Sequence, residues 1–161
     1  MFAKLARLPI AEVLARIERN NRPYVAKVGA KPVAYGWSAS GPAEIDKILR
    51  FDVPDGERYL WDFATLRGWR RLGIYPALLQ EIVRRESPAV SRFWVGHDAG
   101  NKPSRRGIRK AGFRAAGEMW MLPNARFVFR PGDDPDRSDA GATLLGIPLL
   151  RRETSVGARC A

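Results

Sequence analysis

A basic loop with two glycines is the stretch of this sequence whose residue types best suit the binding of an anion. It reads Arg67-Gly68-Trp69-Arg70-Arg71-Leu72-Gly73-Ile74-Tyr75. The stretch before it, 59–66, is apolar and aromatic and predicts a strand buried on both faces. The stretch after it has the apolar spacing of a helix. In a strand–loop–helix arrangement the loop amides and the helix N-terminus point at one spot, so the loop predicts a phosphate site. An ordinary turn with solvent-facing arginines fits the same residues.

The composition is that of one soluble domain with a strong positive charge. The chain has 161 residues, of which 45% are hydrophobic and 28% are charged, so it can bury a core. Its 28 Lys and Arg oppose 17 Asp and Glu, giving a net charge of +11. Residues 67–114 alone carry twelve basic residues against three acids. Such a surface attracts anions such as nucleic acid, acidic lipid or a polyphosphate ligand.

The cysteine content and the hydropathy indicate a cytoplasmic protein. Cys160 is the single cysteine, so no intrachain disulfide can form, which suits a reducing compartment. No apolar run approaches the length of a membrane-spanning helix, and the first residues lack the apolar core of a signal peptide. We expect no membrane segment and no metal.

Periodicity and turn residues predict the elements around the loop. Apolar residues at helical spacing predict a helix over 10–17, and 24–28 with 33–37 predict a hairpin. A short strand at 93–96 should lie parallel to 59–66 because a helix intervenes. Residues 43–51 fit a short helix or an irregular strand equally well. A further helix is predicted over 104–111, closed by Gly112.

The last part of the chain differs in composition. Strands are predicted over 113–122 and 125–130, but Pro131-Gly132-Asp133-Asp134-Pro135-Asp136 is typical of a linker or disordered segment. Leu144 to Leu150 is apolar enough to dock on the core or form a dimer contact, so a homodimer is one possibility. We therefore predict a domain over 1–130 and a tail over 131–161 that is partly ordered at most.

Two motifs give the chain a resemblance to a known family. Arg70-Arg71-Leu72-Gly73-Ile74-Tyr75 follows the central strand, and Asn101 begins a short helical stretch that ends in Gly112-Phe113. With this spacing, residues 10–130 resemble the GCN5-related N-acetyltransferase (GNAT) superfamily, whose first motif is Arg/Gln-x-x-Gly-x-Gly/Ala. Tyr75 departs from that motif's small last residue, and we expect its ring to point into the core. Ile108 stands where many relatives have a tyrosine that can protonate the leaving thiolate.

The resemblance implies an α/β (α+β) fold with a mixed, mostly antiparallel sheet and helices on both faces. The strands at 59–66 and 92–97 would splay apart around acetyl-CoA, the acyl donor. A primary amine would then attack the thioester directly in a ternary complex. The residues implied to bind acetyl-CoA are Phe63, Ala64, Thr65, Arg70, Arg71, Leu72, Gly73, Ile74, Tyr75, Asn101 and Ser104.

The general base that the reaction needs has two nearly equal candidates. Asp62 lies on the central strand, where the resembled family often has a carboxylate, but it could equally be an ion-pair partner of an arginine. His97 is the single histidine and follows the parallel strand, although a capping or packing role also suits it. Glu118 is a third candidate. The five tryptophans fit core packing better than an acceptor pocket.

Two other classes of function stay open. The basic stretch would suit a nucleic-acid-binding module, but no helix-turn-helix, zinc-finger or RNA-recognition signature is present, so the sequence does not favour nucleic acid. Ile108 in the tyrosine position would suit a catalytically silent acyl-CoA-binding sensor or scaffold. The sequence does not select among amine antibiotics, polyamines, amino acids, peptide N-termini and protein lysines as the acceptor.

Overall fold

The computed structural model describes residues 1–150, which form two compact units that divide after Arg114. The first unit contains α1 (Phe2–Ala6), α2 (Ile10–Glu18), β1 (Asn21–Val28), β2 (Lys31–Ala39), β3 (Gly41–Ile45), β4 (Leu49–Val53), β5 (Glu57–Thr65), a 3₁₀ turn (Arg67–Trp69), α3 (Ile74–Glu86), β6 (Arg92–Val95) and α4 (Lys102–Lys110). The second contains β7 (Gly117–Met121), β8 (Phe127–Pro131) and α5 (Pro135–Leu145).

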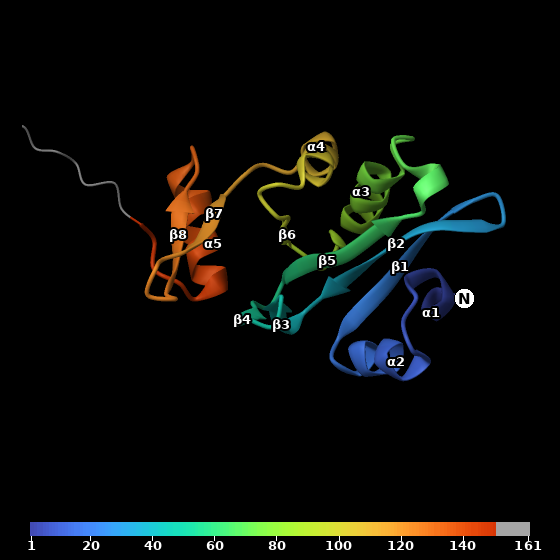
Figure 1. Ribbon diagram of the computed structural model, residues 1–161, viewed down its shortest axis with the longest axis horizontal. Helices are drawn as coiled ribbons and strands as arrows, with labels where there is room; N and C mark the ends of the chain where they lie inside the picture. Colours follow the sequence, from blue (N-terminus) through green and yellow to red (C-terminus); the bar gives the residue numbers. More distant parts are fainter. Residues whose placement is uncertain (151–161) are drawn as a thin grey trace, which may run out of the picture. The chain divides into compact units, whose positions relative to one another are not determined.

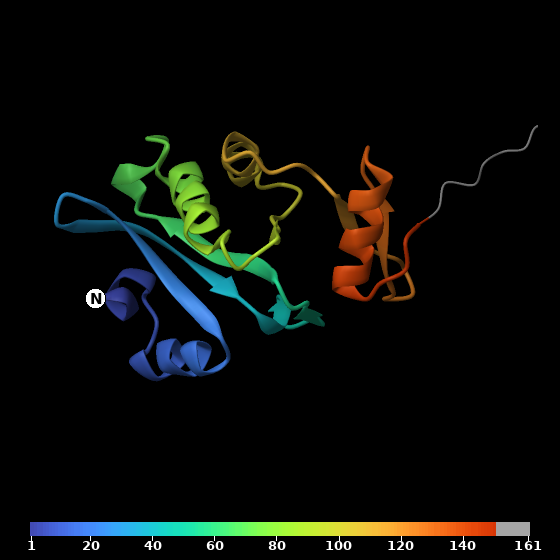
Figure 2. The same ribbon diagram turned by 180° about the vertical axis from the view of Figure 1, so that it is seen from behind.

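A four-stranded mixed sheet is the centre of the first unit (Figure 1). Its strand order is β1–β2–β5–β6, with antiparallel pairing from β1 to β5 and parallel pairing between β5 and β6. The predicted mixed, mostly antiparallel sheet with one parallel pair is thereby confirmed. Helices α3 and α4 lie on one face and α1 and α2 on the other, as the views from the two sides agree (Figures 1 and 2).

The core of the first unit lies between the sheet and α3. Leu78, Leu79 and Ile82 recur at helical spacing along α3, and all three are buried against Leu60 of β5. Ile108 of α4 joins the same cluster. Burying each of these side chains contributes roughly 1.5–3 kcal/mol. The first half of β5 and the start of α3 are therefore held in fixed positions.

An aromatic cluster covers the opposite face of the sheet. Trp37 of β2 is fully buried, with the ring of Phe2 edge-on at 4.8 Å and the ring of Trp61 stacked at 6.3 Å. Arg16 of α2 lies over both indoles, 5.3 Å from Trp37 and 4.6 Å from Trp61. These contacts fix α1 and α2 to the sheet and leave a cation stacked on two aromatic rings.

The structure assigns one stretch that the sequence left undecided and confirms three local predictions. Residues 43–51, which fitted either a helix or a strand, lie in the antiparallel hairpin of β3 and β4. The helix predicted over 10–17 and the hairpin around Gly29 are present as α2 and as β1 with β2. Gly112 follows α4 with a left-handed φ of 100°, as the sequence predicted.

The second unit is ordered where the sequence predicted a linker. Pro131 ends β8, and the Asp134 carboxylate caps α5 by accepting a 2.9 Å hydrogen bond from the amide of Arg137. The hydroxyl of Ser138 donates to the carbonyl of Ala116 at 2.8 Å, which ties α5 to β7. Proline, glycine and aspartate also end strands and begin helices, so their composition alone misled the prediction at 131–136.

The boundary between the two units lies after Arg114, earlier in the chain than the predicted boundary after residue 130. β7 and β8 pair with each other and with no strand of the first unit among the described residues. Leu144 and Leu145 are buried within the second unit, and Leu149 forms a bridge with Phe129. The apolar stretch therefore docks on its own hairpin, while residues 151–161 of the predicted tail lie outside the described residues.

Candidate functional site

β5 changes character in its middle. Its parallel pairing with β6 runs from Glu57 to Leu60 and stops there, while Trp61 to Thr65 pair with β2 alone. Asp62 and Ala64 in this second half are exposed. The expectation of a strand buried on both faces is therefore wrong beyond Leu60, where Asp62 and Ala64 are exposed.

A β-bulge marks the start of the open half. Asp62 has a φ of 49°, and the pairing register shifts so that Gly36 of β2 faces both Asp62 and Phe63. The extra residue breaks the alternation of side chains. Phe63 packs with the core, and its ring occupies the space where a side chain at position 36 would stand. Asp62 points to the other face of the sheet, where it pairs with Arg16 of α2. Bulges re-aim side chains in this way beside functional sites.

The loop after β5 presents a run of backbone amides with no partner. Within residues 1–150, none of the amides from Arg71 to Tyr75 donates a hydrogen bond to the protein, and no side chain caps α3. Gly73, the residue before the helix, has a φ of 78° that other residues adopt only with strain. An uncapped helix N-terminus with free loop amides is suited to a phosphate group.

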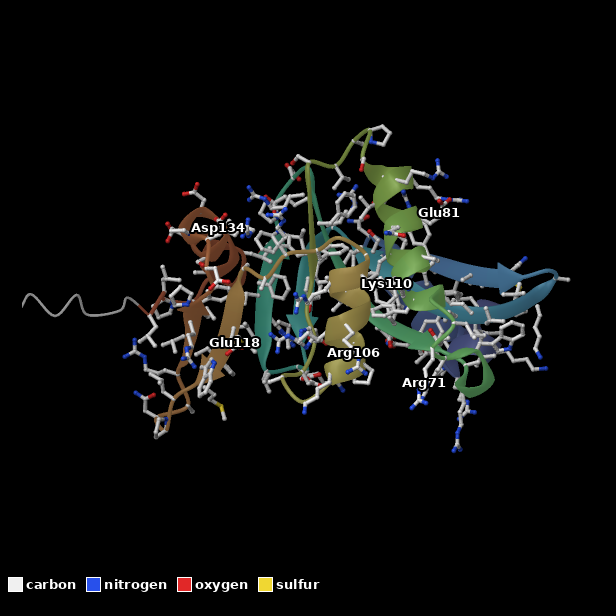
Figure 3. All side chains as sticks on the ribbon, turned by 90° about the horizontal axis from the view of Figure 1, so that it is seen from above. Arg71, Glu81, Arg106, Lys110, Glu118 and Asp134 are labelled. Atoms are coloured by element: carbon white, nitrogen blue, oxygen red, sulfur yellow. The ribbon has the colours of Figure 1, made fainter. Side chains whose placement is uncertain are left out.

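The arginines of this loop play unequal parts. The Nε of Arg70 donates to the carbonyl of Thr65 at 3.1 Å, which ties the loop back to the end of β5. Arg71 is exposed (Figure 3). Across residues 1–150, no carboxylate lies within ion-pair distance of either guanidinium. Arg71 is therefore available to an anion, whereas Arg70 mainly holds the loop against the end of β5.

Tyr75 points its ring inward, as its place at the start of a helix led us to expect. The ring lies 5.4 Å from that of Phe63, and it packs against α4 at Gly107. A Cβ at Gly107 would stand 2.5 Å from Cδ1 of Tyr75, so only glycine admits the ring there. Burial raises the pKa of the Tyr75 hydroxyl, and a hydrogen bond with Ser104 opposes that rise.

Asn101 serves first as the N-cap of α4. Its Oδ1 accepts a 3.1 Å hydrogen bond from the amide of Ser104, a local contact that fixes the start of the helix. Ile108, in the position where relatives have a tyrosine, is only 7% exposed and belongs to the core. Five basic side chains are exposed on α4, and Arg106 and Lys110 among them are labelled in Figure 3; the five are Lys102, Arg105, Arg106, Arg109 and Lys110.

Within residues 1–150, Asp62 and His97 share no hydrogen bond or ion pair, and each has a different partner. Asp62 pairs with Arg16, with 2.5 Å between Oδ2 and Nη1, on the aromatic face. His97 is exposed in the loop after β6, and its Nδ1 lies 2.8 Å from the carbonyl of Asp98. Glu118 belongs to the second unit, where its Oε2 accepts a hydrogen bond from the indole of Trp120 (Figure 3).

Two features of the site were missed in the sequence. Arg16 stacks on Trp37 and Trp61, which are far from it in the chain, and no local sequence pattern predicts such a contact. Gly107 did carry a signal, since a glycine inside a helix weakens it and often marks a close approach. The motif residue Tyr75 and Gly107 are complementary in size only once α3 and α4 meet.

A hollow of about 580 Å³ lies between β1 and the far end of α3, lined by Arg22, Pro23, Tyr24, Val25, Leu78, Glu81 and Arg85. Its carboxylate and guanidinium groups belong to surface ion pairs. Within the described part of the chain, no cluster of His, Cys, Asp and Glu could hold a metal ion. No helix of residues 1–150 has the length and apolar character needed to cross a bilayer.

Among known proteins, the chain has similarity to solved structures in its fold. No family model matches the chain, and no curated protein matches it in sequence. A putative acetyltransferase from Agrobacterium tumefaciens str. C58 superposes with a TM-score of 0.54 at 14% identity, covering 70% of this chain and 75% of that one.

Two aminoglycoside acetyltransferases are similarly related. The enzyme meta-AAC0020 from an uncultured soil metagenomic sample, in complex with sisomicin, gives a TM-score of 0.55 at 18% identity and covers 75% of this chain and 80% of that one. AAC(6')-Ib in complex with coenzyme A and kanamycin gives 0.54 at 24% identity, over 74% and 67%. The chain therefore has the fold of the GCN5-related N-acetyltransferases, as its two motifs predicted.

Proposed function

We propose that this protein transfers an acetyl group from acetyl-CoA to a primary amine. One observation carries the proposal: the open half of β5 leads directly into a loop whose amides from Arg71 to Tyr75 have no partner in residues 1–150. A fold alone does not establish an activity. Here, however, the unpaired edge of β5 and the loop with free amides follow one another directly in the chain, so one segment could bind both the arm and the phosphates of the donor.

The donor site fits the chemistry of acetyl-CoA. Its pyrophosphate would be bound by the loop amides, by the N-terminus of α3 and by the free guanidinium of Arg71. Its pantetheine arm would follow the edge of β5 that β6 leaves unpaired, beside Asn101 and Ser104. The thioester carbonyl would then accept a hydrogen bond from an amide of Phe63, Ala64 or Thr65, the residues after the bulge. Such a donor stabilises the charge that develops on the oxygen.

Asp62 is the better supported candidate for the general base. It is adjacent to the proposed carbonyl-binding amides, and its ion pair with Arg16 orients the carboxylate. As the amine nitrogen bonds to the acetyl carbon, the nitrogen loses a proton, which Asp62 would accept directly or through one water molecule. His97 is exposed in the loop after β6, so we keep it as the second candidate for the base.

The acceptor class can be narrowed by assay. Kanamycin and sisomicin, which are bound in two of the similar structures, are the first amines to try. Aminoglycosides are polycations, and the net charge of +11 opposes their approach, so small monoamines, amino acids and short peptides belong in the same panel.

The test is amine-dependent release of the CoA thiol from acetyl-CoA. We expect release above the rate without amine for at least one member of the panel, with the acetylated amine confirmed by mass spectrometry. Acetyl-CoA that binds but is never consumed would contradict acetyl transfer and support a silent acyl-CoA-binding protein instead.

The basic face of α4 supports one second candidate, binding of nucleic acid. None of its five basic side chains has an acidic partner within residues 1–150, and acetyl-CoA needs only a few charges. Double-stranded DNA affinity should then fall steeply with salt and should be weakened by Arg106→Glu with Lys110→Glu. Equal affinity for the double variant and the wild type would exclude this candidate.

A further inference from the structure

Helix α2 carries an apolar stripe that the described residues leave open to solvent. The α2 stripe consists of Ile10, Leu14 and Ile17, whose exposed fractions are 71%, 53% and 45%. Val13 is the single buried residue of the helix, and Arg16 lies over the indoles of the sheet, so these two mark the side of α2 that faces its own sheet. Several large apolar side chains exposed along one stripe indicate a contact surface.

The spacing of the α2 stripe is that of a seam between two helices. Ile10, Leu14 and Ile17 stand four and then three residues apart, which is the alternation of a coiled-coil seam. The order isoleucine, leucine, isoleucine is also the same when read in either direction. A second α2 in antiparallel orientation would therefore place Ile10 beside Ile17 of the other copy, with both Leu14 side chains near a two-fold axis.

The charges along α2 fit a second copy better than a membrane. Although the chain has a net charge of +11, α2 itself has two glutamates, Glu12 and Glu18, against one arginine, so it offers no attraction to anionic lipid. Glu18 is exposed and has no ion pair within residues 1–150, and the same holds for Arg7, which precedes the helix. In an antiparallel pair, Glu18 at the end of one helix lies near Arg7 before the start of the other.

We propose that this protein forms a two-fold symmetric homodimer in which two copies of α2 pack antiparallel along the α2 stripe. The seam is short, so the dimer is weak and depends on protein concentration. The inner side of the same helix carries Arg16, which pairs with Asp62, so the contact would also steady the helix that orients this carboxylate. The dimer does not depend on the proposed acetyl transfer, because neither the donor loop nor an acceptor takes part in it.

The first experiment measures the molar mass of the full chain by sedimentation velocity over a dilution series. Physiological ionic strength is used, since charges more than about 8 Å apart are then largely screened. We expect the wild type to change from one chain to two as its concentration rises. Leu14→Glu should stay monomeric up to about 1 mM, because the dimer would bury two unpaired carboxylates in an apolar seam.

A matched control separates the α2 stripe from exposed apolar residues in general. Ile48 is 60% exposed in the turn between β3 and β4, so Ile48→Glu should dimerise as the wild type does. Because Leu14 is itself more than half exposed, Leu14→Glu should keep the Tm of the monomeric wild type. Loss of the dimer in that variant then reports the contact rather than the fold.

The second experiment tests the antiparallel orientation at Ala11, an exposed residue two helical turns before Glu18. In the antiparallel pair, Ala11 of each copy lies near Glu18 of the other. Ala11→Arg should therefore tighten the dimer by up to about tenfold, since the two-fold axis creates two ion pairs, and Ala11→Glu should weaken it. A parallel pair would bring the two substituted residues together, so both variants would weaken it.

Each of the following results would overturn the proposal. A wild type that stays monomeric up to about 1 mM would exclude the dimer. A dimer that persists in Leu14→Glu would place the contact elsewhere, and an Ala11→Arg dimer no tighter than the wild type would exclude the antiparallel seam. A monomeric wild type that binds vesicles of phosphatidylcholine and phosphatidylserine, beside a Leu14→Glu variant that does not, would assign the α2 stripe to a lipid surface. Failure of acetyl transfer would leave all these measurements unchanged.

Discussion

The two halves of β5 belong to one strand but face different surroundings. Glu57 to Leu60 lie between β2 and β6, and Leu60 is fully buried under α3. Trp61 to Thr65 keep β2 on one side, and no strand of the described residues pairs with them on the other. The enclosed half supplies the stability that lets the open half hold a bulge with a left-handed Asp62. A strained segment persists only where its neighbours fix it.

Two carboxylates show the same contrast. Glu86, at the end of α3, is 2% exposed in its side chain and accepts hydrogen bonds from Tyr24 at 2.7 Å and from Arg58 of β5 at 2.8 Å. Asp62 is 32% exposed in its side chain and pairs with Arg16. We assign Glu86 to holding β1, β5 and α3 together, and Asp62 to the proposed chemistry.

The largest effect should come from removing the charge of Asp62. We expect Asp62→Asn to lower kcat/KM about 10²- to 10⁴-fold, the usual share of one general base, with the acetyl-CoA-induced Tm shift retained. His97→Gln is the parallel variant and should change kcat/KM much less. A strongly impaired His97→Gln beside an active Asp62→Asn would transfer the base role to the loop after β6.

Removing the Glu86 charge should affect stability rather than ligand binding. Glu86→Gln leaves Arg58 without its charged partner in a buried setting, which should cost about 3 kcal/mol in the free energy of unfolding. Urea denaturation measures the loss, and acetyl-CoA should still raise the Tm of the folded variant. If Glu86→Gln were as stable as the wild type but unable to bind acetyl-CoA, the division between the two halves of β5 would be wrong.

A smaller effect is expected at Asn101. Asn101→Ala removes the cap of α4 and should cost about 1 kcal/mol of stability, whereas Asn101→Asp keeps an oxygen acceptor and should cost much less. Comparing the acetyl-CoA affinities of the two folded variants separates capping from contact with the ligand. Equal affinities in both variants and the wild type would restrict Asn101 to its role in the helix.

The smallest effect on stability should come from the surface ion pairs that Glu81 of α3 forms with Arg84 and Arg85. Hydrogen bonds from Arg84 and then Arg85 lower the pKa of Glu81 to about 2. A lowered carboxylate pKa stabilises the folded state above the unfolded pKa, and that contribution disappears as pH falls toward 2. Because the Glu81 side chain is partly exposed and its arginine partners are exposed, Glu81→Gln should change the urea midpoint little at pH 7, and less still in high salt. A loss as large as that of Glu86→Gln would refute this distinction.

Local patterns in the sequence were sufficient for much of the fold. Apolar spacing predicted α2 and α3, and the helix between two apolar strands predicted the parallel pairing of β5 with β6. The order of strand, glycine loop and helix around residue 73 was also predicted, and the structure adds that Gly73 has a left-handed φ of 78°. These features depend on residues close together in the chain.

Features that depend on distant residues could not be predicted in the same way. The end of pairing at Leu60 depends on where β6 turns away, and the apolar residues after Leu60 give no sign of it. The partner of Asp62 is Arg16, one arginine among many in a basic chain. The packing of Tyr75 on Gly107 likewise exists only once α3 and α4 have met.

The most direct test of the proposed donor site is acetyl-CoA binding by variants of Gly73. A Cβ at this position would have no atom of the described residues within 4 Å, so Gly73→Asp and Gly73→Asn should both fold at a similar cost from the left-handed φ. Only the aspartate places a negative charge where the phosphates would bind. Acetyl-CoA should raise the Tm of the wild type and of Gly73→Asn but not of Gly73→Asp. An equal rise in all three proteins would contradict the account, because the loop after β5 would then not bind the donor.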